Sequence, residues 1–295
     1  MTETVSEKYK GLDNWPMEKT IEAIIESNQN AVLAVKKALP ELGKAAEGIR
    51  KSLARGGRLI YLGAGTSGRL AVQDAVELAP TFGFDNYLVL MAGGESATGK
   101  AQEEAEDDAL TAIKRIDDAE VNKNDAVVGI AASGNTPFTV AGVKRARALG
   151  AFTVGISNNP NTNVLKEAEI GVFLDTGPEV LAGSTRLAAG TSQKIALNAL
   201  STSVLVKLGG AYGNLMVGMR AKNEKLHKRA INMVVEATGC TKEEALGVLE
   251  PNAWNIKLAI VAIKTKLDYK DAQMLLHSNS GRVRDALKEY KSDTL

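Results

Sequence analysis

The chain of 295 residues has little of what disulfides and most metal sites require. Cys240 is its only cysteine, which excludes an internal disulfide and a metal site built from several thiolates. The two histidines, His227 and His277, lie late in the chain and far apart, so a histidine-rich metal centre is not expected. We expect no metal-based chemistry.

The chain also lacks an excess of either charge and has no long apolar run. The formal net charge is +1, so no global field favours nucleic acid or an anionic membrane. No apolar run approaches the roughly 18 residues that a membrane-spanning helix needs, and the first residues, MTETVSEK, lack the apolar segment of a signal peptide. With 44% hydrophobic and 24% charged residues, the composition is typical of a globular protein, which we expect to be cytoplasmic.

Apolar patterning predicts a polar arm, an α/β domain and a helical C-terminus. The arm covers residues 1–16, and two helices follow at 17–39, which Pro40 ends, and at 41–53. Five apolar runs then alternate with helices, which predicts a parallel sheet covered on both faces. The strands are predicted at 58–62, 87–92, 126–131, 151–156 and 170–174, and the helices at 67–79, 97–118, 137–149 and 185–207.

The remaining pattern is helical. Gly239 fits the cap after a helix at 221–238, and Thr241 with Glu244 forms a capping box for the next. Further helices are predicted at 241–250, 253–266, 268–277 and 281–290. We divide the chain into N-terminal arm and helices at 1–48, a ligand-binding α/β domain at 49–220, and a helical linker with a small bundle at 221–295.

Two strand-to-helix junctions carry similar polar loops. The first reads GAGTSGR at 63–69 and the second reads ASGNTP at 132–137. Free N–H groups at a helix start, glycines that admit a ligand and hydroxyl donors together favour phosphate. Ligands of parallel sheets bind at the carboxyl ends of strands, where both loops lie. The loop residues predicted to hold a phosphorylated small molecule are Gly65, Thr66, Ser67, Ser133, Asn135 and Thr136.

The glycine spacing of the first loop also permits other interpretations. G-x-G-x-x-G suggests a dinucleotide site, but the second strand ends LMAGG at 90–94, without the carboxylate that would bind a ribose. No Gly-Lys-Ser/Thr follows, which excludes a P-loop. A tight turn in which Ser67 only caps the helix remains open for one loop alone; the repetition of the same chemistry at Ser133 and Thr136 disfavours it.

Two carboxylates are candidates for proton transfer. Gln73, Asp74 and Glu77 share one stripe of the helix at 67–79, which as a pattern is typical of a solvated face. Glu77, however, falls in the last turn before Pro80, where the helix dipole disfavours negative charge, as suits a general acid.

The second candidate lies in the acidic run at 103–108. On a continuous helix at 97–118, Glu106 falls nearest the apolar stripe, and the other acidic residues fall further away on a solvated face. A carboxylate that leans into an apolar interface needs a partner, a raised pKa or a chemical role. Two separated carboxylates near a phosphate site suit acid–base work on a sugar phosphate.

Several motifs in one order resemble those of the N-acetylmuramic acid 6-phosphate etherases, from about residue 40 to the C-terminus. The resemblance implies a sugar isomerase (SIS) domain with a five-stranded parallel sheet of flavodoxin-like type, usually dimeric, and a small helical C-terminal domain. The segments that carry it are GRLIYLGAGTSGR at 57–69, ELAPTFG at 77–83, AGGE at 92–95, EEAED at 103–107, GIAASG at 129–134, GSTR at 183–186 and NEKL at 223–226.

The resemblance also implies a reaction. Such a lyase cleaves the lactyl ether of N-acetylmuramate 6-phosphate by elimination and water addition, in cell-wall sugar recycling, without a metal or organic cofactor. Glu77 matches the family's proton donor and Glu106 its second acid–base glutamate. Ser67, Ser133 and Thr136 would hold the phosphate, and Ser184 of the GSTR motif would contribute to substrate binding.

The sequence departs from the family pattern where cations are usual. Asn135 and Phe138 replace an arginine and a tyrosine, Ala188 replaces a lysine, and Leu78-Ala79 replaces Cys-Pro. The substrate carries a phosphate and a carboxylate, so lost cations bear on its preference. The cations that could compensate are Arg69, Arg186, Lys194 and Lys225.

Two other functions use the same phosphate site. A sugar-phosphate isomerase would release no lactate, and a non-catalytic sugar-phosphate sensor would bind without turnover; the pair of glutamates argues against the sensor. A transcription regulator is disfavoured because no basic recognition helix is apparent. His227 suits a surface or packing role, or in a dimer could reach a neighbouring site.

Overall fold

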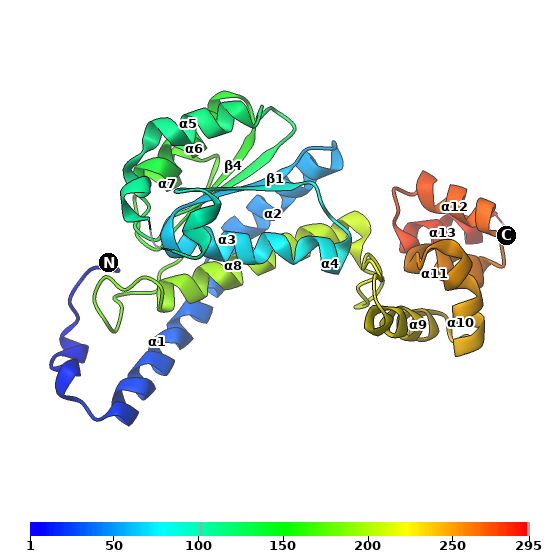
Figure 1. Ribbon diagram of the computed structural model, residues 1–295, viewed down its shortest axis with the longest axis horizontal. Helices are drawn as coiled ribbons and strands as arrows, with labels where there is room; N and C mark the ends of the chain where they lie inside the picture. The colour runs from blue at the N-terminus through cyan, green and yellow to red at the C-terminus, as the bar shows by residue number, and fades with distance from the viewer. Residues whose placement is uncertain (101, 294–295) are drawn as a thin grey trace. The chain divides into compact units, whose positions relative to one another are not determined.

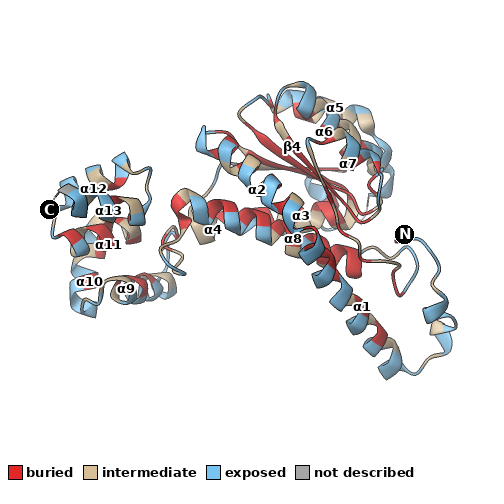
Figure 2. Ribbon diagram, turned by 180° about the vertical axis from the view of Figure 1, so that it is seen from behind, coloured by how far each residue is buried: buried red, intermediate tan, exposed pale blue. Residues whose placement is uncertain are grey.

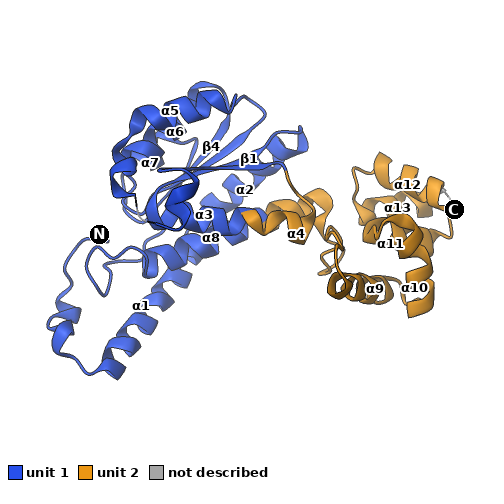
Figure 3. Cartoon of the chain, viewed as in Figure 1, with its two compact units in different colours: residues 1–75, 86–201 blue, residues 76–85, 202–295 orange. Residues whose placement is uncertain are grey.

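The structure is a computed structural model that describes residues 1–100 and 102–293. These form two compact units, each assembled from two stretches of chain (Figure 3). Unit 1 comprises Met1–Ala75 and Asn86–Ser201, and unit 2 comprises Val76–Asp85 and Thr202–Leu295. The three-part division at 48/49 and 220/221 stays a prediction.

A five-stranded parallel sheet forms the centre of unit 1, in the order β2-β1-β3-β4-β5. All five predicted strands are confirmed, with small shifts of their ends. Each is a short apolar run between polar turns, and most of their residues are buried (Figure 2). The strands are β1 (Leu59–Gly63), β2 (Tyr87–Met91), β3 (Ala126–Ile130), β4 (Phe152–Ser157) and β5 (Ile170–Phe173).

Helices cover both faces of this sheet (Figure 1). Ile60 and Leu62 of β1 pack with Phe138 and Val143 on the side of α5 (Ala109–Asp118), α6 (Pro137–Ala148) and α7 (Asn163–Glu167). The other side carries α2 (Leu39–Ala54), α3 (Gly65–Val76) and α8 (Ala188–Leu205). Alternate strand residues therefore serve two cores, which explains the near-continuous apolar strands.

The N-terminal segment differs from the predicted polar arm. Short 3-10 turns cover Glu7–Tyr9 and Leu12–Asn14, and α1 covers Met17–Lys37. Pro40 does not end the first helix but stands in the first turn of α2, where a missing N–H costs nothing. Thr2 is buried, so the beginning of the arm is part of the packed structure.

Two predicted helices are wrong in their continuity. The predicted helix at 67–79 is α3 followed by α4 (Leu78–Phe82). The predicted helix at 97–118 consists of 3-10 segments at Glu95–Thr98 and Glu103–Asp107 and then α5. Asp108 accepts a hydrogen bond from Thr111 N–H at 2.8 Å and thereby starts α5 anew. Residue 101, inside the predicted helix, lies outside the described residues.

Unit 2 contains a helical core of its own, with Ala230, Leu249, Leu258 and Ala272 among its buried residues. Gly239 caps α9 in the left-handed conformation, and Thr241 accepts from Glu244 N–H, which confirms both predicted caps. No helix within residues 1–100 and 102–293 is long and apolar enough to cross a membrane. The helices of the bundle are α9 (Glu224–Thr238), α10 (Lys242–Leu249), α11 (Ile256–Thr265), α12 (Tyr269–Ser278) and α13 (Val283–Asp293).

Candidate active site

Both polar loops leave neighbouring strands at the same edge of the sheet. β1 and β3 pair in parallel, and Gly63 is the register partner of Ile130. The first loop continues into α3, and the second continues into α6, whose N-cap is Thr136. Two helix starts with free backbone N–H groups therefore lie side by side, as a phosphate site at the carboxyl edge requires.

The first loop is shaped around Glu106. Gly65 has φ +52°, and a Cβ atom placed on it would lie 2.7 Å from Oε1 of Glu106. The positive φ favours glycine, and a side chain here would also require the Glu106 carboxyl to move. Ser67, two residues on, is nearly buried, and Thr66 faces Gly190 of α8. The structure thus places the second candidate carboxylate directly against the predicted phosphate loop.

Burial raises the pKa of Glu106 above its ordinary value. The negative charges of Glu103 and Asp107 raise this pKa further, and the positive charge of Arg69 lowers it. The half-buried carboxyl therefore retains its proton to a higher pH than a solvated glutamate would. The continuous helix from which we predicted its inward orientation is absent, yet Glu106 does lean into the protein.

The second loop is held by its own hydroxyls and by a side-chain amide. Oγ of Ser133 lies 3.3 Å from Oγ1 of Thr136 and accepts from Asn135 N–H at 3.3 Å. The Asn135 side chain accepts from Asn163 N–H at 3.0 Å. Asn135, where the resemblance implies an arginine, therefore fixes the loop to the start of α7.

Gly134 has φ +73°, and a side chain there would collide with the hydroxyls of Ser157 and Thr162. The second loop accordingly needs glycine for both conformation and space. The Thr162 hydroxyl is buried without a hydrogen-bond partner.

Ser184 lies in the segment before α8, and the N-terminus fastens this segment. The carbonyl of Thr2 accepts from Gly183 N–H at 3.1 Å. The Asn159 side chain donates to Thr2 Oγ1 and to the carbonyl of Ala132, both at 2.9 Å. Thr2 and the side-chain amide of Asn159 thus connect the Ser184 segment to Ala132, the residue before Ser133.

Glu77 occupies the junction between α3 and α4, where it is exposed. It belongs to unit 2, whereas Glu106 and both loops belong to unit 1. The predicted position of Glu77 in the last turn of a helix before Pro80 is wrong: α3 ends at Val76, and Glu77 is the N-cap residue of α4, which contains Pro80. The role of Glu77 as proton donor stays a prediction.

Sequence reasoning missed the buried carboxylates, of which Asp74 and Glu179 lie beside α8. Asp74, predicted on a solvated stripe, is buried and accepts from Tyr61, Asn198 and Ser201 at 2.6, 2.5 and 3.1 Å. The buried Glu179 accepts from the N–H groups of Ala188 and Ala189 at 3.0 and 2.9 Å. The acceptor role of Glu179 depends on the chain folding back so that the N–H groups nine and ten residues later reach its carboxylate, which a sequence pattern does not show.

The cations of the candidate site are few. Nε of Arg69 donates to the carbonyl of Ala97 and Nη2 to that of Lys100. Ala188, where the resemblance implies a lysine, is buried, and its N–H donates to Glu179, so this position supplies no cation. Within the described part of the chain, no group of three or more metal-ligating side chains could hold a metal ion.

Comparisons with known proteins decide the family. The chain is 46% identical to an N-acetylmuramic acid 6-phosphate etherase of Cronobacter sakazakii, over 98% of both chains. It is 43% identical to the etherases of Clostridium botulinum and Deinococcus radiodurans, over 98% of this chain and 96% and 95% of theirs. The chain belongs to the N-acetylmuramic acid 6-phosphate etherase family.

Two domain descriptions agree with this family. Residues 41–147 match the N-terminal SIS domain of glucokinase regulatory protein, and residues 111–203 match the SIS domain in general. A solved phosphoheptose isomerase from Francisella tularensis superposes with a TM-score of 0.50 at 18% identity, covering 65% of this chain and 100% of that one. The predicted fold class, a parallel SIS sheet with a helical C-terminal region, is confirmed.

Proposed function

We propose that this etherase family member is a carbon–oxygen lyase that cleaves the D-lactyl ether of N-acetylmuramate 6-phosphate. The products are N-acetylglucosamine 6-phosphate and D-lactate, and the context is recycling of cell-wall amino sugars. The similarity of 43–46% over almost the whole chain to proteins named for this activity carries the proposal. No metal or organic cofactor enters the mechanism.

The reaction proceeds by elimination followed by hydration. In the open-chain sugar, a base removes the C2 proton, the C3–O bond breaks, and lactate leaves with a proton from a general acid. Water then adds across the resulting double bond, with hydroxyl at C3 and a proton at C2. The ether is thus exchanged for a hydroxyl without net oxidation.

Two glutamates divide the proton transfers in this proposal. Glu77 protonates the departing lactate, and Glu106 takes the C2 proton and later serves the incoming water. The position of Glu106 against Gly65 supports its role, because it puts a half-buried carboxyl beside the first loop. Glu77 is assigned by its match to the family motif.

The hydroxyls of Ser67, Ser133 and Thr136 hold the phosphate, together with backbone groups of Gly65 and Thr66. Asn135 and Ser184 complete the substrate contacts. The common edge from which the two loops depart supports this assignment.

The test is incubation with N-acetylmuramate 6-phosphate and enzymatic measurement of D-lactate. Replacing either glutamate, as Glu77→Gln or Glu106→Gln, should abolish lactate release and leave binding of the sugar phosphate nearly unchanged. Glu104→Gln, an exposed neighbour of Glu106, is the matched control and should retain full turnover. Wild-type turnover in both glutamate variants would show that the assignment is wrong.

The same assay separates the rival functions. A sugar-phosphate isomerase would interconvert aldose and ketose phosphates without lactate, and a sensor would bind the sugar phosphate without turnover. Lactate formation in proportion to substrate loss excludes both.

We further propose that the chain acts as a homodimer in the cytoplasm. α1 exposes several large apolar side chains, which a second copy would cover. Those side chains are Met17, Ile21, Ile25, Val32 and Leu33. The cytoplasm follows from the substrate, since a charged sugar phosphate does not cross a bilayer unaided.

A further inference from the structure

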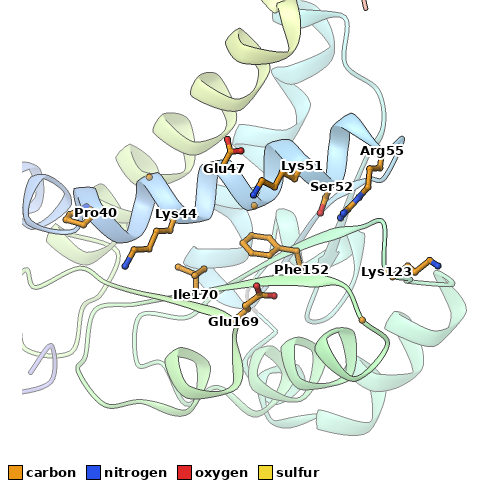
Figure 4. Close-up of a pocket in the computed structure, with 13 residues that line it drawn as sticks. Pro40, Lys44, Glu47, Lys51, Ser52, Arg55, Lys123, Phe152, Glu169 and Ile170 are labelled. Carbon is orange, nitrogen blue, oxygen red and sulfur yellow. The ribbon is translucent and has the colours of Figure 1, made fainter.

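A cavity of about 770 Å³ lies beneath α2, at the edge of the sheet opposite the two polar loops (Figure 4). We name it the α2 cavity. One wall is α2, and the other is formed by the amino ends of β4 and β5, with Phe152 and Ile170, and by the turn at Lys123. This volume falls in the range of small-molecule sites, of roughly 300–1,000 Å³. No part of the proposed reaction uses it.

Two glycines of α2 line the cavity. Gly48 lets the ring of Phe152 rest directly on the helix backbone, where any side chain would collide with that ring. Gly43, five residues earlier, would place a Cβ atom in open space, with nothing within 4 Å. Glycine inside a helix costs about 1 kcal/mol relative to alanine. At Gly43 no close contact or positive φ requires glycine, so a larger side chain can be placed there beside the cavity.

Four cations line the α2 cavity, and none forms an ion pair with another described residue. Lys44, Lys51 and Arg55 recur along one face of α2, and Lys123 faces them from the turn before β3. Figure 4 shows Lys51 and Arg55 projecting toward the Phe152 side.

The acidic groups do not balance these cations. Glu47 points away from Phe152 (Figure 4) and accepts from Nε and Nη2 of Arg50 at 2.8 and 2.7 Å. Glu169 is the one other carboxylate in the cavity lining. The four cations are exposed and share the lining of one concave surface, so solvent screens their mutual repulsion, and an anion in the cavity would be attracted by all four.

We propose that the α2 cavity binds a phosphate ester of a small molecule, as a second ligand site separate from the active site. The guanidinium of Arg55 suits paired phosphate oxygens, and the lysines supply point charges. Phe152 and Ile170 offer an apolar wall to the organic part. A nucleotide and a phosphorylated metabolite share this chemistry.

The test measures binding of ATP, inorganic pyrophosphate and adenosine to the whole protein by calorimetry, with N-acetylglucosamine 6-phosphate present in saturating amount to occupy the active site. Gly43→Met fills the cavity and keeps all four cations, whereas Gly43→Ala gives a similar gain in helix propensity and leaves the cavity open. Thermal melting confirms that both variants fold.

We expect ATP or pyrophosphate to bind wild type and Gly43→Ala alike, and to bind Gly43→Met and Lys51→Met at least roughly tenfold more weakly. Lys36→Met, which removes an exposed cation of α1, should leave binding unchanged. Preference for ATP would identify a nucleotide; equal binding of pyrophosphate would identify the phosphates alone as the ligand.

Three results would overturn the proposal: no binding at millimolar ligand, equal binding to Gly43→Met and Gly43→Ala, or adenosine binding as tightly as ATP. Displacement by N-acetylglucosamine 6-phosphate would also overturn it, by placing the ligand in the active site. Lactate release by wild type, measured separately, keeps this outcome distinct from a failure of the proposed function.

Discussion

The pKa of Glu106 is set by burial and by neighbouring charges, and single substitutions can remove those charges one at a time. Burial, Glu103 and Asp107 all raise its pKa. Removing the charge of Glu103 should therefore lower that pKa, so that Glu106 is deprotonated and competent as a base at lower pH. In Glu103→Gln we expect the acid limb of kcat/KM for lactate release to move to lower pH than in wild type.

Two variants test whether this shift is electrostatic. Arg69→Met removes a positive charge that lowers the pKa of Glu106, so its acid limb should move to higher pH. Glu104→Gln, whose charge has no resolved effect on Glu106, should leave the profile in place. An acid limb that moves to higher pH in Glu103→Gln, or a shift that Glu104→Gln reproduces, would contradict the proposed role of Glu106 as base.

Glu179 is a buried carboxylate with a structural task at the start of α8. Its two oxygens accept from the N–H groups of Ala188 and Ala189. Glu179→Ala leaves both donors without an acceptor, and we expect the free energy of unfolding to fall by about 1–3 kcal/mol. Urea denaturation measures this, with the exposed Glu22→Ala of α1 as control; equal stability of the two variants would refute it.

The same residue gives wild type a pH dependence of known sign. Burial raises the pKa of Glu179, and the hydrogen bonds from the two N–H groups lower it by less. The folded state therefore holds this proton more tightly than the unfolded state. Its contribution to the free energy of unfolding is greatest below the ordinary glutamate pKa and declines as pH rises through the raised folded value. In Glu179→Ala, the part of the dependence of unfolding free energy on pH that comes from this residue should be absent.

At the scale of elements, one ion pair joins the amino ends of β1 and β3. Asp125 is buried and accepts from the Arg58 side chain at 2.7 and 3.2 Å, and from backbone N–H groups of Arg58 and Asn122. Asp125→Asn should lower the free energy of unfolding by about 3 kcal/mol, because it leaves the guanidinium partly buried without its countercharge. Asp117→Asn, at an exposed pair with Arg145, should cost less than about 1 kcal/mol.

Acid titration checks this pair independently. Burial alone would raise the pKa of Asp125, but the hydrogen bonds from Arg58 and Asn122 outweigh burial and lower it. The stabilisation is therefore complete above the ordinary aspartate pKa and is lost as pH falls through the lowered folded value. A wild-type protein and Asp125→Asn that lose stability in parallel over that range would contradict the pairing.

The elements also show what the sequence could and could not predict. Five strands were predictable because each is a short apolar run with a polar turn at its end. The continuous helix at 97–118 was not predictable as broken, because the break depends on a side-chain cap. Asp108 accepts from Thr111 N–H and begins a new helix at Ala109, and the apolar periodicity of the sequence does not show this. Asp74 was misplaced on a solvated face because its partners, Tyr61 and Ser201, come from β1 and α8.

The candidate site was predictable in part for the same reason. Local chemistry indicated the two loops, and the structure brings them to one edge of the sheet. The approach of Glu106 to Gly65, and the fastening of the Ser184 segment by Thr2, depend on contacts between distant parts of the chain. The assignment of the site residues stays a prediction.

At the scale of the whole molecule, the apolar face of α1 bears on assembly. Ile21 and Ile25 are one turn apart and more than half exposed. Ile21→Glu or Ile25→Glu should weaken a dimer that buries this face, raising its dissociation constant by roughly tenfold or more. Sedimentation equilibrium measures this, with Lys19→Gln, an exposed residue on another face of α1, as control; a monomeric wild type at micromolar concentration would refute the proposed dimer.

Unit 2 is formed from two separate stretches of chain, which limits how recombination could exchange it between genes. Val76–Asp85, which includes Glu77, is encoded between two stretches of unit 1, far from the remainder of its own unit. A recombination event at residue 202 would transfer the helical bundle and leave this short segment behind. The two units therefore cannot be exchanged between genes at a single junction. A lineage that lost the C-terminal part would retain Val76–Asp85 without the unit to which this segment belongs.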